Sequence, residues 1–105
     1  MPFYGYIGIP DPATQSTFGS KYVSGKVCDW SVKEGTFTKP EQKIGTVDIA
    51  GRRYGLIICF PALIEKLYAA AGSADASDDF ILKWIVDGES IPYGRAYFRL
   101  EASDT

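Results

Sequence analysis

Arg95, Tyr97 and Arg99 alternate along residues 93–102, a stretch of the sequence that is typical of a β-strand. Because every second residue of a strand points to the same face, these three side chains would form one row. A guanidinium group pairs with phosphate and stacks on aromatic rings, and a tyrosine ring can stack on a nucleic-acid base. The row therefore predicts a local nucleic-acid-binding patch, with an ordinary solvated sheet face as the alternative.

The sequence offers little for catalysis or for metal binding. It contains no histidine, which removes the commonest general base near neutral pH and the commonest metal ligand. Cys28 and Cys59 lie far apart in the sequence, so we expect buried free thiols rather than metal ligands or a disulfide framework. Asp87 and Glu89 are close, but they flank a turn glycine and no nucleophilic, basic or metal partner converges on them. We predict no catalytic residue, no metal site and no cofactor.

The composition is that of an ordinary globular domain. The chain has 105 residues, of which 46% are apolar and 23% charged, so we expect one domain over residues 1–105 with its own core. No apolar run approaches the roughly 20 residues that cross a bilayer, and the first residues lack the features of a signal peptide. These observations predict a cytoplasmic protein with no membrane partner.

The net charge of −2 is unevenly distributed along the chain. Residues 20–60 carry seven basic and four acidic side chains, a local charge of +3, whereas residues 61–105 carry four basic and eight acidic ones, a local charge of −4. The first segment could supply a basic face, and the second could meet a basic partner. A chance distribution over a solvated surface is the alternative.

Apolar alternation predicts strands along most of the chain. A hairpin turns at residues 50–53, and a continuous apolar run follows it, as expected for a strand buried on both faces. The second strand is long, and a bulge is expected at Gly25. The predicted strands are residues 3–9, 21–33, 46–50, 56–60, 80–86 and 93–102.

A helix is predicted over residues 62–72, directly after the apolar run. Pro61 suits the first helical position, Leu63 and Leu67 have helical spacing, and Gly72 suits the position after the last turn. Combined with the strands, this helix indicates a mainly β fold, a five-stranded antiparallel OB-like Greek-key barrel. The alternative fold is an open α+β antiparallel sheet with one packed helix.

The order of these features resembles the OB domain of the bacterial and phage single-stranded DNA-binding proteins. Residues 8–12, GIPDP, match the segment that follows the first strand in that family. Residues 54–60, YGLIICF, match its aromatic-led apolar strand before the helix. Lys83-Trp84 matches the end of its next strand, and Arg95 with Tyr97 matches the start of its last one. The family's long glycine-rich tail with an acidic tip has no counterpart in this sequence.

The resemblance implies a set of DNA-binding residues and a set of partners. Phe60 and Trp84 have core packing as an alternative role. The expected ligand is single-stranded DNA, with RNA as an alternative, and the protein is expected to form a homo-oligomer. The implied stacking residues are Trp30, Tyr54, Phe60 and Trp84. The implied backbone-tracking residues are Lys26, Lys33, Lys39, Lys43, Arg52, Arg53 and Lys83.

A second hypothesis is a protein-binding module of the same fold. Its acidic half would imitate nucleic acid or dock a basic protein partner, as small acidic inhibitory proteins encoded by phages do. On this hypothesis the protein would be of phage or mobile-element origin. The charge that surrounds the exposed aromatic residues discriminates between the two hypotheses. Basic surroundings favour a nucleic-acid ligand, and acidic surroundings favour a basic protein.

Overall fold

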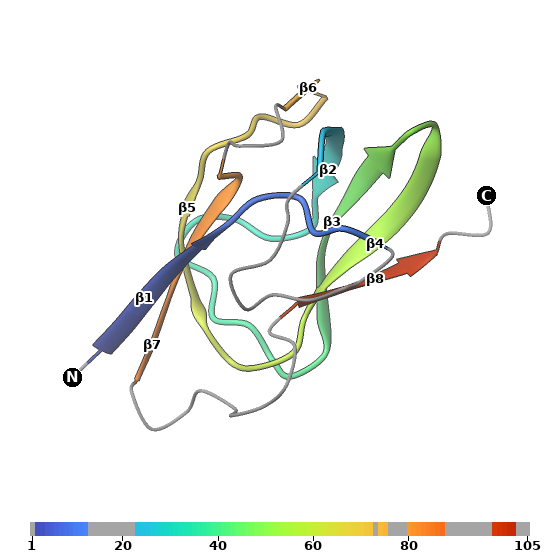
Figure 1. Ribbon diagram of the computed structural model, residues 1–105. Helices are drawn as coiled ribbons and strands as arrows, with labels where there is room; N and C mark the ends of the chain where they lie inside the picture. Colours follow the sequence, from blue (N-terminus) through green and yellow to red (C-terminus); the bar gives the residue numbers. More distant parts are fainter. Residues whose placement is uncertain (1, 13–22, 73, 76–79, 88–97, 103–105) are drawn as a thin grey trace.

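The computed structural model describes residues 2–12, 23–72, 74–75, 80–87 and 98–102 (Figure 1). Within these residues the chain forms β-strands and no helix. This result contradicts the expected helix and, with it, both of the predicted fold classes. The strands are β1 (Pro2–Ile7), β2 (Gly25–Trp30), β3 (Gln42–Ile49), β4 (Arg52–Ile58), β5 (Leu63–Leu67), β6 (Ala74–Asp75), β7 (Leu82–Asp87) and β8 (Phe98–Ala102).

The strands form two antiparallel sheets. One has three strands in the order β1-β7-β5, and the other has five in the order β6-β2-β3-β4-β8. Among the described residues no strand pairing joins the two sheets, so the expected closed barrel is also wrong. Figure 1 shows the three-stranded sheet on the left and the β3–β4 hairpin on the right.

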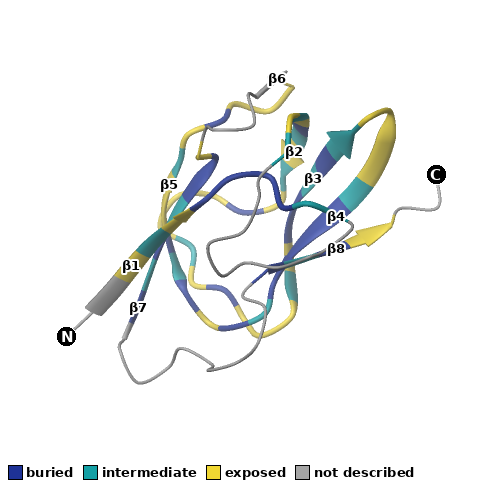
Figure 2. Ribbon diagram, viewed as in Figure 1, coloured by how far each residue is buried: buried dark blue, intermediate teal, exposed yellow. Residues whose placement is uncertain are grey.

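Phe60 links the cores of the two sheets. Its ring centroid lies 5.2 Å from that of Trp84 on β7 and 6.0 Å from that of Phe98 on β8, both in edge-on geometry. Val27 of β2 and Leu56 of β4 are fully buried in the same cluster. Figure 2 shows that the buried positions lie mainly along the strands, while the hairpin tip is exposed. The core is therefore made of side chains from both sheets.

A bulge in β5 explains why its sequence has the spacing of a helix. The β5–β7 register shifts between Ile64 and Lys66, so Glu65 is the extra residue. Such an insertion breaks the alternation of a strand and leaves two polar residues together between apolar ones. Gly72 does adopt a positive φ of 85°, but within a turn, and its N–H donates to the carbonyl of Val27. Tertiary pairing thus overrides the helical pattern.

The remaining strand predictions are confirmed in outline. The second strand is shorter than expected, and its bulge lies at Cys28, between Val27 and Asp29, instead of at Gly25. The predicted hairpin turn at residues 50–53 is confirmed in position but is shorter: Ala50 and Gly51 form it, with positive φ angles of 52° and 82°, and Arg52 and Arg53 already belong to β4. The last strand is described from Phe98 onward, so its predicted first part, residues 93–97, lies outside the described residues.

Candidate functional site

Four exposed aromatic side chains gather on the outside of the three-stranded sheet. The ring centroid of Tyr6 lies 6.1 Å from that of Tyr4, 6.2 Å from that of Tyr68 and 5.3 Å from that of Phe80. These rings are between 36% and 64% exposed. Four neighbouring aromatic rings at this exposure form a continuous apolar surface, which is typical of an interaction site.

The alternation of β1 places Tyr4 and Tyr6 on this outer face. Between them Gly5 faces the core, where an added Cβ would lie 2.4 Å from the ring of Trp84. Ile7, two residues after Gly5, is buried as well. The glycine therefore lets the Trp84 ring pack directly against the β1 backbone, while both tyrosine rings remain outside.

Strand pairing extends the surface across the sheet. Phe37 pairs with Leu63 of β5, Leu63 pairs with Ile85 of β7, and Ile85 pairs with Tyr4 of β1. Directly paired residues of antiparallel strands share a face, so these four side chains form one apolar row. Phe37 is 75% exposed at the end of the row. Its segment is fixed to β5 because Gly35 and Thr38 donate backbone hydrogen bonds to Ile64 and Ala62.

Two lysines lie among these aromatic residues. The Lys83 ammonium lies 4.9 Å from the ring centroid of Tyr4 and 5.6 Å from that of Tyr6, and the Lys66 ammonium lies 5.6 Å from that of Tyr68. Lys66 and Lys83 are direct partners in the β5–β7 register. We call the whole surface the aromatic face; it consists of Tyr4, Tyr6, Phe37, Leu63, Lys66, Tyr68, Phe80, Lys83 and Ile85.

Like charges directly opposite one another destabilise a sheet. In the part of the chain that the structure describes, no ion pair joins Lys66 or Lys83 to an acid. Glu65 is exposed in the bulge, and Glu34 lies at the β5 edge, where its carboxylate accepts a hydrogen bond from the Leu67 N–H. The register thus brings two lysines together on one face, where their positive charges could bind an anionic ligand.

The four aromatic residues implied by the family resemblance lie elsewhere. Phe60 and Trp84 are 2% and 6% exposed, so neither ring can stack on a base in this structure. Trp30 is half-buried, and its Nε1–H donates a hydrogen bond of 2.7 Å to the Ala69 carbonyl. Tyr54 is half-buried near the turn of the β3–β4 hairpin, with the Arg52 guanidinium 5.6 Å from its ring centroid.

The basic candidates are spread over the molecule. Lys39 is exposed in the loop before β3, and Lys43 is exposed on β3. Lys83 belongs to the aromatic face, whereas Lys26, Arg52 and Arg53 are exposed on or beside the β3–β4 hairpin. Lys33 is exposed in the loop after β2. The structure therefore does not bring these residues together into one groove.

Only one residue of the predicted C-terminal patch is described. Arg99 donates hydrogen bonds to Glu41 at 3.2 Å and to Glu101 at 3.3 Å, which binds its guanidinium within the protein. The hydrogen bond to Glu41 is the main cause that raises the pKa of Arg99. Arg95 and Tyr97 lie outside the described residues, so the patch remains a prediction.

Sequence reasoning missed most of the aromatic face. Tyr4 and Tyr6 lie on a correctly predicted strand, and the alternation around Gly5 was the signal that could have placed both rings on one face. Tyr68 lies within residues 62–72, for which the sequence predicts a helix and not a strand edge. Phe80 begins the predicted strand 80–86, where alternation puts it on the same side as Trp84, but Phe80 is 48% exposed whereas Trp84 is 6% exposed.

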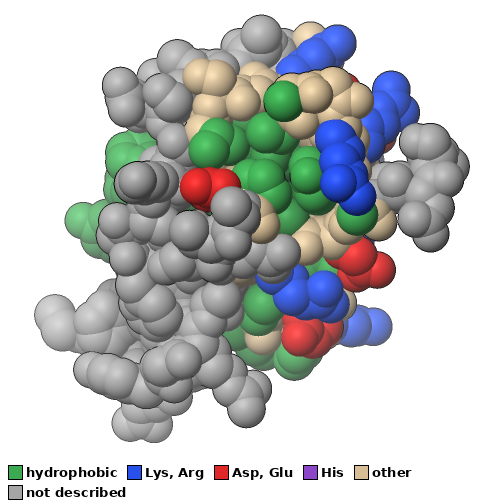
Figure 3. All heavy atoms as spheres, turned by 45° about the vertical axis from the view of Figure 1, so that its right-hand side comes forward, with side chains coloured by type: hydrophobic (Ala, Val, Ile, Leu, Met, Phe, Trp, Pro, Cys, Tyr) green, Lys and Arg blue, Asp and Glu red, His purple; other side chains and the backbone are tan. Residues whose placement is uncertain are grey.

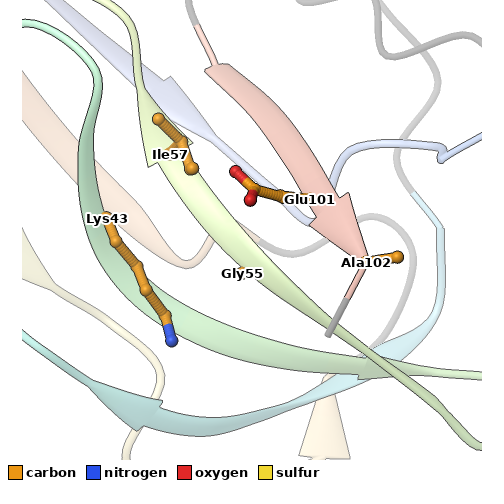
Figure 4. Close-up of a pocket in the computed structure, with 5 residues that line it drawn as sticks. All are labelled: Lys43, Gly55, Ile57, Glu101 and Ala102. Carbon is orange, nitrogen blue, oxygen red and sulfur yellow. The ribbon is translucent and has the colours of Figure 1, made fainter. Parts of the chain in front are cut away.

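A shallow hollow lies on the outer face of the five-stranded sheet. It has a volume of about 330 Å³ and is lined by Lys43, Gly55, Ile57, Glu101 and Ala102 (Figure 4). Because Gly55 carries no side chain, the floor is backbone, and the Lys43 and Glu101 side chains stand on either side of it (Figure 4). Within the described residues, no group of three or more His, Cys, Asp or Glu could hold a metal ion.

Cys59 lies close to Glu41 and Arg99, which form an ion pair. Burial, reinforced by the Glu41 carboxylate, raises the pKa of its thiol to about 11. At neutral pH the side chain is therefore a thiol rather than a nucleophilic thiolate.

Comparisons with models of protein families, with curated proteins and with solved structures gave no significant match. In the described ranges no helix has the length and hydropathy that a membrane span requires.

Proposed function

We propose that this protein is a non-catalytic binder of single-stranded nucleic acid, and that the aromatic face is its binding surface. The observation that carries the proposal is the pair of directly opposed lysines, Lys66 and Lys83, each with its ammonium over a tyrosine ring. Such a surface offers positive charge and flat rings at the same place. A single strand supplies the matching phosphates and bases.

The chemistry of the face favours a strand with accessible bases over duplex DNA. A base stacked on an aromatic side chain contributes about 1–3 kcal/mol, and every base has a π-face, so binding would depend little on sequence. In a duplex the base faces are already stacked on one another. We therefore expect single strands to bind more tightly than duplexes of equal length.

The same chemistry is shared by DNA and RNA. The described polar groups of the face are tyrosine hydroxyls and ammonium groups, which can contact phosphate in either polymer. We take single-stranded DNA as the first ligand to test, and we expect RNA to bind with similar affinity because stacking does not involve the 2′-hydroxyl.

A basic protein partner is a poorer match for this surface. Lys66 and Lys83 would repel a basic partner at the centre of the face, and an acidic face is what such a partner requires. The homo-oligomer and the cytoplasmic location stay predictions from the sequence; light scattering and cell fractionation would test them.

A fluorescence anisotropy titration with labelled oligothymidine tests the proposal. We expect saturable binding, with a loss of about 5- to 150-fold in affinity for Tyr6→Ala, as expected for one lost stacking contact. Ser24→Ala, an exposed residue before β2, serves as the control and should bind like the wild type. Absence of saturable binding at low salt would refute the proposal.

A further inference from the structure

We propose that the β3–β4 hairpin, together with the neighbouring β2, is a second contact surface for the phosphate backbone of the same strand. This inference rests on the proposed function and extends it to the other sheet. The surface consists of Lys26, Arg52 and Arg53, which we call the hairpin cations. Figure 1 places the hairpin and the three-stranded sheet on opposite sides of the molecule.

Strand register places these cations on both sides of the hairpin. Lys26 pairs with Asp48, and Asp48 pairs with Arg53, so the three side chains form one row on the face opposite the buried Val47. Arg52 precedes Arg53 and points to the other side, where its guanidinium lies over the ring of Tyr54. Phosphates could therefore approach the hairpin from either side.

The hairpin has a defined shape at its tip. Ala50 and Gly51 both have positive φ angles, as a tight two-residue hairpin turn requires. The carboxylate of Asp48 accepts a hydrogen bond of 3.0 Å from the Gly51 N–H. The one acidic side chain in the row thus has a structural role in the turn.

The hairpin cations differ from Arg99 in their ion pairing. Arg99 is bound by two glutamates. Within the described residues, no ion pair joins Lys26, Arg52 or Arg53 to an acid. Figure 3 brings forward the side of the molecule that carries the β3–β4 hairpin in Figure 1, and several Lys and Arg side chains lie at the surface there. These charges can therefore pair with an external anion.

Phosphate is the group that this surface matches best. An arginine fork can bind two phosphate oxygens at once, and stacking on Tyr54 limits the orientations of the Arg52 fork. Among the described residues, Tyr54 is the aromatic ring that contacts these cations, and it is half-buried, so the hairpin offers little for base stacking. The contribution that we expect from the hairpin cations to the binding free energy is electrostatic. It depends on salt concentration, unlike the contribution of base stacking on the aromatic face.

The test measures affinity against salt concentration for a short and a long oligothymidine, of about 6 and about 25 nucleotides, chosen around the site sizes of single-strand binders. Each phosphate contact on a single strand contributes about −0.7 to the slope of log K against log salt. We expect Arg52→Gln/Arg53→Gln to make the slope for the long oligonucleotide shallower by about 1.4. The slope for the short oligonucleotide should be the same for this variant as for the wild type.

Two further variants make this test specific. Arg52→Lys/Arg53→Lys keeps both charges and should keep the slope. Lys26→Gln, on a different strand, should make the long-oligonucleotide slope shallower by about 0.7. Urea unfolding of each variant should match the wild type because the three side chains are exposed.

The outcomes separate this inference from the proposed function. One outcome is that Tyr6→Ala weakens the binding of both oligonucleotides while Arg52→Gln/Arg53→Gln leaves the salt slope for the long oligonucleotide unchanged. In that case the aromatic face binds alone, and the inference is overturned. An equal slope change for both lengths would also overturn it, because the hairpin would then not be a separate contact. If the wild type binds neither oligonucleotide, the proposed function itself fails.

Discussion

Lys66 and Lys83 stand directly opposite each other on β5 and β7, among the aromatic rings of the outer sheet face. A cross-strand pair of like charges destabilises a sheet, whereas opposite charges contribute about 0.2–1 kcal/mol. From this register we expect repulsion between the two lysines to be a cost in the isolated protein. It would be reduced by a phosphate group lying between them.

Lys66→Glu should move stability and binding in opposite directions. The substitution creates an opposite-charge pair with Lys83, so the free energy of unfolding in urea should rise by up to about 1 kcal/mol. Oligothymidine binding should weaken, since the face loses a cation and gains an anion. Lys66→Gln is the matched control, and its free energy of unfolding and its oligothymidine affinity should lie between those of the wild type and of Lys66→Glu. Equal binding by all three proteins would show that the lysine pair does not contact the ligand.

Exposed and buried aromatic residues should respond differently to truncation. Phe60→Ala removes a ring packed between two others in the core and should destabilise the protein by about 3–5 kcal/mol. Tyr4→Ala removes a ring that is 64% exposed and should cost about 1 kcal/mol or less. Urea denaturation measures both values, and a large loss for Tyr4→Ala would mean that this ring has a structural role.

Gly5 and Gly55 should differ sharply in their tolerance of a methyl group. At Gly5 the added Cβ would lie 2.4 Å from Trp84, so Gly5→Ala should destabilise the protein by about 1–3 kcal/mol through overpacking, and it should shift tryptophan fluorescence. At Gly55 the nearest atom is the Lys43 Cε at 3.4 Å, the end of a flexible side chain. We expect Gly55→Ala to unfold at nearly the wild-type urea concentration; equal destabilisation would contradict the packing described.

The Cys59 thiol should be slow to react with iodoacetamide below pH 9. Its pKa is raised from 9.0 to about 11 in the folded protein, so the thiolate becomes abundant only near pH 11. The unfolded chain loses this proton at lower pH, so raising the pH from 9 to 11 favours unfolding through this group. Mass spectrometry of a Cys28→Ser variant isolates the reaction of Cys59. Rapid alkylation at pH 8 would contradict the raised pKa.

Local patterns predicted most strands because alternation and turn residues act over a few positions. The hairpin turn at Ala50-Gly51 and the buried faces of β4 and β7 follow from such patterns. The helix prediction over residues 62–72 was wrong because a bulge at Glu65 gives β5 the apolar spacing of a helix. That bulge depends on pairing with β7, which is distant in the sequence.

The candidate site was harder to predict because residue type does not determine exposure. Trp84 and Tyr6 both lie on strands, yet one ring faces the core and the other faces outward. The resemblance selected Phe60 and Trp84, which the fold buries. Lys83 is among the basic candidates of the sequence, but its partner Lys66 lies within the residues for which a helix was predicted, so the pairing of the two could not be foreseen.

Ultraviolet crosslinking of the protein to oligothymidine, with peptide mapping by mass spectrometry, tests the central claim most directly. Tryptophan quenching is less suitable because Trp84 is buried and Trp30 is half-buried and hydrogen-bonded to Ala69. We predict crosslinks at Tyr4, Tyr6, Tyr68 or Phe80. Efficient crosslinking that maps only to other peptides would contradict the assignment of the aromatic face as the binding surface.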